Sequence, residues 1–217
     1  MPFVLSYGWD RNPPRLLKKF GFGGRLKSKS EEDSFLALVS QSPCLLHGVC
    51  LVMGGFMDGI LGKAYAVLGL LPEILRTNFD IYYREHDEDE AARSLILSYG
   101  RAHRSVIAIG HSWGGSTLAL DVLGSAFVRQ IPIAVLLTLD PVGVRSPVPL
   151  PNVRRWLNIY IDYGKADWRR QNIIARMGSP WGSVPYASEN RVFSGSNHAD
   201  ASGMVREHGI PLLTVRQ

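Results

Sequence analysis

Continuous apolar runs, separated by segments of polar or helical pattern, recur along most of this chain. Runs of this kind are typical of strands that are buried on both faces of a parallel sheet. The pattern predicts strands at 44–53, 79–83, 105–109, 131–139, 156–161 and 191–194. It predicts helices at 59–76, with a break near Pro72, at 85–104 and at 116–123. The alternation indicates an α/β fold: a doubly wound, mostly parallel sheet with helices on both faces.

The amino-terminal segment has a different character. Residues 1–40 are rich in Gly, Pro, Lys and Ser and show no clear periodicity, so we expect a loosely structured basic arm there. The chain has 217 residues, of which 46% are hydrophobic, and this is enough for one substantial core. We therefore predict a single domain over 1–217 that begins with the arm.

A glycine-rich turn lies where the apolar run 105–109 meets the helical pattern 116–123. The turn reads Gly110-His111-Ser112-Trp113-Gly114, and Gly115 follows. A direct turn from strand to helix strains its central residue, and small neighbours allow the two elements to approach closely. This is the G-x-S-x-G pattern of a nucleophile elbow, which predicts that Ser112 is exposed as a nucleophile.

A serine hydroxyl needs a base that takes its proton and an acid that orients the base. Asp140 and Asp162 both follow apolar runs, so either carboxylate would lie at the end of a strand. Strand-end aspartates are also common as turn or capping residues. We favour Asp140 as the acid and keep Asp162 as the alternative.

The order of the elements along the chain excludes most of the six histidines as candidates for the base. His111 lies inside the turn, and its side chain is expected to point away from that of Ser112. His198 lies in a loop of small residues after the last predicted strand, from which it can reach back over the serine. His208 lies in a pattern that resembles a helix end, where a histidine is stable without a catalytic role. We therefore predict that His198 is the base.

The stretch 45–198 resembles the α/β-hydrolase superfamily, and Leu139-Asp140-Pro141 is similar to the acid segment of its lipase branch. The resemblance implies a Ser112 nucleophile, an Asp140 acid and a His198 base. It also implies an oxyanion hole formed by the amide of Trp113 and one amide from the loop that begins Gly54-Gly55-Phe56. We choose the amide of Phe56 as this second donor and keep that of Met57 as the next candidate. The chain departs from the family in having Met53 where an H-G-G-G loop has its histidine.

These residues predict a serine esterase or lipase that works through an acyl-enzyme, without a metal or an organic cofactor. The expected substrate is a small-molecule or lipid ester. Residues 163–190 combine aromatic and basic side chains, which can hold an acyl chain and a phosphate head group or can be ordinary packing. The alternatives are a catalytically inactive interaction protein of the same fold and a phospholipase-type secreted effector.

Composition and charge limit the partners. The net charge is +5, and part of the excess lies in 15–19 and 25–29, which can touch a membrane surface but are more simply solvated segments. The turn at Ser112 has neither G-x-G-x-x-G nor a Walker lysine, so we expect no phosphate cradle there. We also expect no nucleic-acid partner. Cys44 and Cys50 are expected to be buried thiols. Composition does not fix the oligomeric state.

The sequence shows neither a long apolar segment nor a signal-peptide pattern, so we expect no transmembrane helix and no signal peptide. The default expectation is a cytoplasmic protein, and export by another route stays open.

Overall fold

The computed structural model describes residues 48–56, 58, 62–72, 75 and 78–214. The predicted basic arm, Cys44 and Met57 lie outside these residues. The described part forms an α/β fold around a six-stranded sheet in the order β2-β1-β3-β4-β5-β6, and every pair of neighbouring strands is parallel. The predicted fold class, a parallel sheet with interleaved helices, is confirmed.

The strands coincide with the apolar runs and differ from the prediction at their ends. Their bounds are β1 Gly48–Gly54, β2 Phe79–Glu85, β3 Ser105–His111, β4 Val135–Leu139, β5 Trp156–Tyr160 and β6 Glu189–Val192. The run 131–139 becomes a strand only from Val135. Pro132 cannot donate a ladder hydrogen bond, and Ile133 forms only an isolated bridge with Val153.

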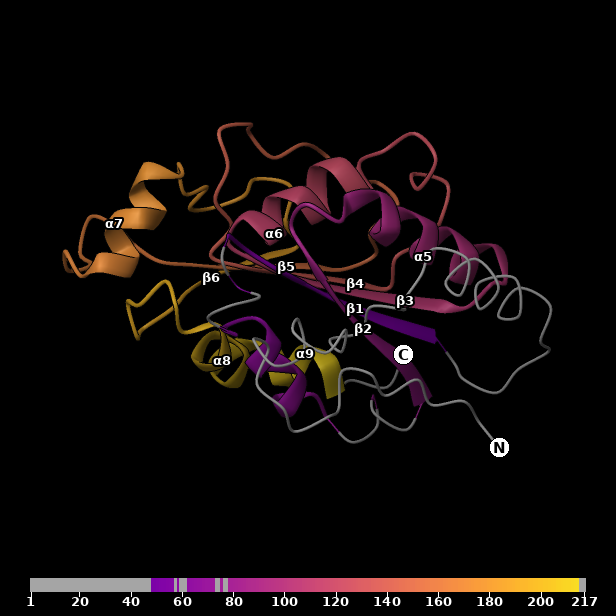
Figure 1. Ribbon diagram of the computed structural model, residues 1–217, viewed down its shortest axis with the longest axis horizontal. Coiled ribbons are helices and arrows are strands. Elements are labelled where there is room, and N and C mark those ends of the chain that lie inside the picture. The colour runs from indigo at the N-terminus through magenta and orange to yellow at the C-terminus, as the bar shows by residue number, and fades with distance from the viewer. Residues whose placement is uncertain (1–47, 57, 59–61, 73–74, 76–77, 215–217) are drawn as a thin grey trace.

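Helices cover both faces of the sheet (Figure 1). One face carries α5 Asp89–Arg101, α6 Trp113–Thr117 and the π-helical η2 Leu118–Leu123; the other carries the 3₁₀ helix η1 Tyr65–Leu70, α8 Ala201–Met204, the π-helical η3 Val205–Gly209 and α9 Ile210–Thr214. Successive side chains of β1 alternate between the two cores: Val49 and Leu51 pack under α5, whereas Cys50 and Val52 pack against η1. Helix α7, Arg170–Met177, lies apart at one end of the molecule (Figure 1).

The predicted helix 59–76 is described only in part. Its described residues contain the 3₁₀ helix η1 and, after a break at Leu71 and Pro72 that was predicted near Pro72, the helical residue Leu75. Gly62 has a φ of 69°, a left-handed conformation that interrupts an α-helix. Leu71 is extended, with a ψ of 133°, as the residue before a proline prefers.

The strand order reverses between β1 and β3, because β2 lies on the outer side of β1 and the chain then returns to β3 on its inner side. In parallel α/β sheets, the crevice at such a point, at the carboxyl ends of the strands, is where ligands bind. The segments that begin there are Gly54-Gly55-Phe56 after β1 and the turn at Ser112 after β3.

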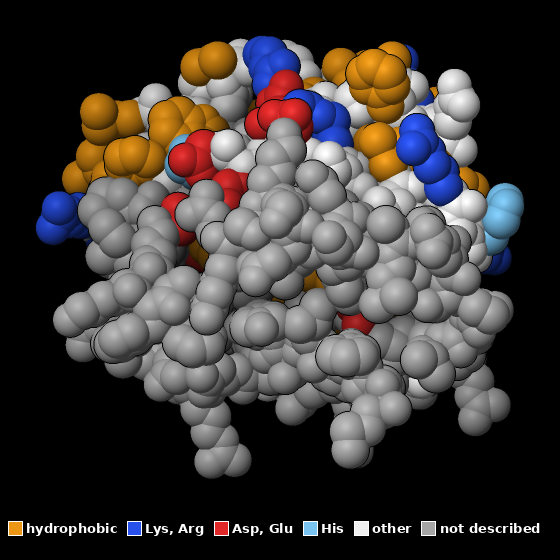
Figure 2. Space-filling view, turned by 45° about the vertical axis from the view of Figure 1, so that its right-hand side comes forward, with side chains coloured by type: hydrophobic (Ala, Val, Ile, Leu, Met, Phe, Trp, Pro, Cys, Tyr) orange, Lys and Arg blue, Asp and Glu red, His pale blue; other side chains and the backbone are white. Residues whose placement is uncertain are grey.

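The described residues mix charges on the face shown in Figure 2, where acidic and basic side chains stand side by side along the upper edge. An ion pair joins Arg93 and Asp89, four residues apart on α5, at 2.6 Å. None of the described helices is long and apolar enough to cross a membrane.

Candidate active site

Ser112 occupies a strained position between β3 and α6. Its φ of 56° and ψ of −130° are unusual for a residue with a side chain. The small neighbours explain how this conformation fits: a β-carbon added to Gly114 would lie 2.4 Å from the carbonyl oxygen of Gly54, and one added to Gly55 would lie 2.6 Å from Cβ of Ser112. The Ser112 amide donates to the carbonyl of Leu139 at 3.0 Å, which fixes the turn against β4.

The side chains of Ser112, His198 and Asp140 form a continuous chain of contacts. Oγ of Ser112 lies 2.8 Å from Nε2 of His198, and Nδ1 of the same ring lies 2.6 Å from Oδ2 of Asp140. Asp140 is 1% exposed and His198 is 7% exposed. Three residues that are widely separated in the sequence therefore meet in the order serine, histidine, aspartate, as the predicted roles of nucleophile, base and acid require.

Asp140 follows β4 directly and is held by three donors. Its φ of 43° is left-handed, a conformation that aspartate tolerates better than most residues. The Ile161 amide donates to Oδ1 at 3.1 Å, and the Tyr163 hydroxyl donates to Oδ2 at 2.5 Å, the oxygen that also faces His198. Burial and the Asp140 carboxylate raise the pKa of Tyr163, so the phenol keeps its proton and remains a donor.

The alternative acid is turned toward other partners. Asp162 accepts from the Gly164 amide at 3.1 Å, and its other oxygen lies 3.3 Å from Nζ of Lys165. The structure therefore brings Asp140, and not Asp162, into contact with His198.

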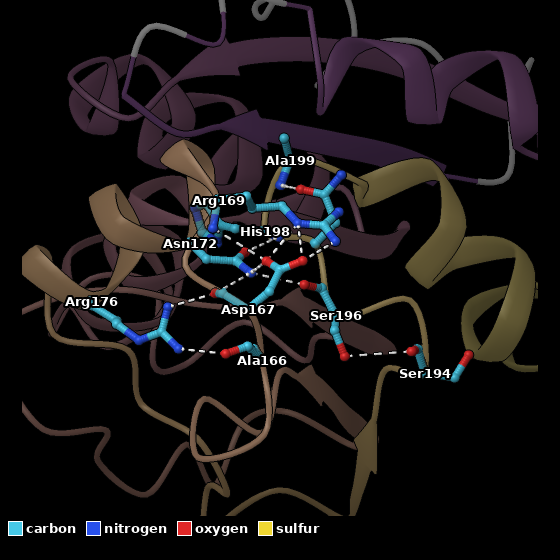
Figure 3. A network of polar contacts seen from close by, with 10 residues as sticks. Ala166, Asp167, Arg169, Asn172, Arg176, Ser194, Ser196, His198 and Ala199 are labelled. Carbon is cyan, nitrogen blue, oxygen red and sulfur yellow. Dashed lines mark hydrogen bonds and ion pairs between the residues drawn. The ribbon is translucent and has the colours of Figure 1, made fainter.

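The backbone that leads into His198 is fixed by the buried side chain of Asn172 on α7 (Figure 3). Oδ1 of Asn172 accepts from the His198 amide at 3.0 Å, and Nδ2 donates to the carbonyl of Ser196 at 2.9 Å. The same Nδ2 donates to Oδ1 of Asp167 at 3.0 Å, and Asp167 also binds Arg169. Asn172 thus joins α7 to the loop that carries the histidine.

His111 is also part of this site, although the sequence predicted only that its side chain points away from that of Ser112. It is buried, its ring lies 5.0 Å from that of His198, and its Nε2 lies 2.7 Å from the carbonyl oxygen of His198. Burial, and next the nearby His198, lower the pKa of His111 to about 4. His111 is therefore neutral at neutral pH and can donate to that carbonyl.

The residues expected to form an oxyanion hole lie on the two segments that meet at the switch of strand order. Trp113 begins α6, so no carbonyl of that helix can accept from its amide. The Trp113 ring contacts that of Phe56 edge to face, with centroids 5.7 Å apart, and stacks on His86 at 5.8 Å. Trp113 is 39% exposed and Phe56 56% exposed, so both present apolar surface beside Ser112. Their role as amide donors stays a prediction.

A cavity of about 290 Å³ adjoins this aromatic group. It is lined by His86, Trp113, Ser116, Thr117, Leu120, Gly143, Val144 and Arg145. Arg145 forms an ion pair with Asp121, which raises the pKa of its guanidinium.

The remaining candidates do not reach the site. Nε2 of His208 lies 3.2 Å from the carbonyl of Val192 and 3.0 Å from Glu207, on the surface. Cys50 is buried, and burial raises the pKa of its thiol to about 12. No group of three or more potential metal ligands occurs among the described residues.

Comparison with protein-family models and with curated proteins gives no match to this chain.

Proposed function

We propose that this protein is a serine hydrolase that cleaves carboxylic esters, built on an α/β-hydrolase fold. The observation that carries the proposal is the chain of contacts from Ser112 through His198 to Asp140, with distances of 2.8 and 2.6 Å. The strained turn at Ser112 and its place at the switch of strand order support the same conclusion.

The reaction proceeds in two steps that balance in protons. In the first, Oγ of Ser112 attacks the ester carbonyl while Nε2 of His198 accepts the hydroxyl proton. The negative oxygen that develops is stabilised by the amides of Trp113 and Phe56. His198 then gives the proton to the departing alcohol, which leaves an acyl group on Ser112. In the second step, water attacks the acyl carbonyl while Nε2 of His198 takes a proton from it. The bond to Oγ then breaks, His198 returns the proton to Oγ of Ser112, and the carboxylic acid is released.

The charges around His198 suit this cycle. The imidazolium that forms during the attack faces the buried carboxylate of Asp140, which stabilises it. His111, the other histidine against the ring, is neutral because burial lowers its pKa to about 4, so it adds no repelling charge. Tyr163 and the Ile161 amide hold the carboxylate in place.

Apolar surface beside the nucleophile favours an ester with an apolar acyl or alcohol part. Phe56 and Trp113 are partly exposed next to Ser112, and Leu120 and Val144 continue that surface into the neighbouring cavity. Lipid esters, including phospholipids, are the substrate class that we propose to test first.

A catalytically inactive interaction protein of the same fold is the second candidate. Such a protein would be expected to lack one of the three side chains or to hold them apart. Here Ser112, His198 and Asp140 are all present and in contact, which favours the enzyme.

A fluorophosphonate probe tests the proposal, because it rapidly labels only an activated serine. We expect labelling of the wild-type protein, with the adduct located on Ser112 by peptide mass spectrometry. Labelling should disappear in Ser112→Ala and almost disappear in His198→Ala, while His208→Ala should keep it. A folded wild-type protein that is not labelled would support the inactive alternative.

A further inference from the structure

Helix α7 presents its apolar side chains outward. Of its eight residues only Asn172 and Ala175 are buried, whereas Ile173, Ile174 and Met177 are 40%, 49% and 81% exposed. At about 100° per residue, the three apolar side chains occupy an arc of about 100° opposite the buried pair. A helix on the surface of a globular protein normally has the reverse arrangement.

Trp168 extends the same surface. Its side chain is 72% exposed, and the guanidinium of Arg176 lies 4.2 Å above its ring, which holds the indole against α7. We call Trp168, Ile173, Ile174 and Met177 the α7 surface. Figure 1 places α7 at one end of the molecule, so a flat partner can approach it.

The segment that carries the α7 surface has an excess of positive charge. Residues 162–178 contain four basic side chains, Lys165, Arg169, Arg170 and Arg176, and two acidic ones, Asp162 and Asp167. Two of the bases are paired: Lys165 with Asp162 at 3.3 Å, and Arg169 with Asp167. Arg176 donates to the carbonyls of Tyr163, Ala166 and Asp167, and Arg170 is exposed. The excess of positive charge remains.

We infer that the α7 surface docks on an anionic lipid membrane. Isoleucine and methionine side chains gain from insertion at the boundary between head groups and acyl chains, and tryptophan favours that depth. Arginine and lysine at the rim are attracted by anionic head groups. A second copy of this chain fits less well, because a two-fold contact through this surface would bring like charges together.

The docking would place the membrane next to the proposed active site, since Asn172 on the buried side of α7 holds the His198 loop. This relation to catalysis rests on the proposed function. The binding itself does not, so it is measured on the full chain with Ser112→Ala, which cannot consume lipid.

The test is co-sedimentation with vesicles of phosphatidylglycerol and phosphatidylcholine in equal parts, compared with pure phosphatidylcholine. We expect the protein to bind the mixed vesicles and to bind the pure phosphatidylcholine vesicles more weakly. The double substitution Ile174→Ser and Met177→Ser should lower the partition coefficient about tenfold. Arg170→Glu should weaken binding to the mixed vesicles only.

Phe127→Ser is the matched control, because Phe127 is 73% exposed and lies in the segment between η2 and β4, at the opposite ends of the strands. It should leave binding unchanged. Three results would overturn the inference: no binding by the parent protein, equal binding by the double variant, or equal loss in Phe127→Ser. A concentration-dependent dimer that the double variant abolishes, without vesicle binding, would instead assign the surface to a second copy.

Discussion

Tyr163 and His198 bind the same carboxylate oxygen: Oδ2 of Asp140 lies 2.5 Å from the phenol oxygen and 2.6 Å from Nδ1 of the imidazole. The phenol therefore fixes the oxygen that orients the proposed base. Tyr163 is a positioning residue, since it acts on the reaction only through Asp140.

Tyr163→Phe should lower kcat about tenfold, the effect of one lost hydrogen bond to a charged group, and leave KM nearly unchanged. Steady-state kinetics on a soluble acyl ester measure both constants. Tyr186→Phe, at a half-exposed tyrosine, is the control and should change neither. An increased KM with an unchanged kcat would show that Tyr163 serves substrate binding and not the acid.

The two strand-end aspartates should differ sharply in their effect on turnover. Asp140→Asn should lower kcat by a factor on the order of 10⁴, because an amide favours the wrong tautomer of His198. Asp162→Asn keeps an oxygen that can accept from the Gly164 amide and loses only the ion pair with Lys165, so it should change kcat little. If the Asp162 variant were the inactive one, the acid assignment and the similarity to the lipase branch would both fail.

Asn172 should affect catalysis through the position of His198. Asn172→Ala removes the acceptor of the His198 amide and the donor to Ser196, so we expect kcat to fall about tenfold with little change in KM. Gln171→Ala, at the exposed neighbouring position, is the control. Thermal unfolding measured in parallel separates the two roles: a lower melting temperature with an unchanged kcat would mean that Asn172 only supports the fold.

Stability should fall with acid because of His111. Its pKa is about 4 in the folded protein, since burial disfavours the charged ring, and about 6.5 in the unfolded chain. The unfolded state therefore binds more protons between these values, and the free energy of unfolding should decrease as pH falls from about 6.5 to 4, by at most about 3 kcal/mol.

Urea unfolding at a series of pH values measures this effect. His111→Gln keeps a donor but does not titrate, so its pH dependence should be flatter in that window. His208→Gln, at a surface histidine, should keep the wild-type slope. Equal slopes for all three proteins would assign the acid sensitivity to other groups.

The parallel sheet was predicted correctly from the sequence, and the three side chains that the sequence pointed to as a triad lie in contact, while their catalytic roles stay a prediction. Strands buried on both faces produce continuous apolar runs, and the turn at Ser112 has a local glycine pattern, so both leave a signal in short stretches. Asp140 and His198 could be chosen because each follows a predicted strand. The exact strand ends depend on local chemistry: Pro132, for example, has no backbone N–H to donate, and β4 begins only after it.

The supporting residues could not be predicted in the same way. Asn172 contacts a residue 26 positions away, Tyr163 one 23 positions away and His111 one 87 positions away. Each of these contacts exists only once the sheet has brought the strand ends together, and no periodicity or motif marks it. The sequence showed only that aromatic and basic residues are combined in this region. It could not show that the apolar side chains of α7 face outward, because tertiary packing decides which side of a short helix is buried.

The most direct measurement of the central claim is ester turnover by Ser112→Ala against a panel of soluble acyl esters and phospholipids, with folding checked by circular dichroism. We expect the wild-type protein to hydrolyse at least one member of the panel and the folded variant to lose this activity by several orders of magnitude. Undiminished turnover by a folded Ser112→Ala protein would contradict the account.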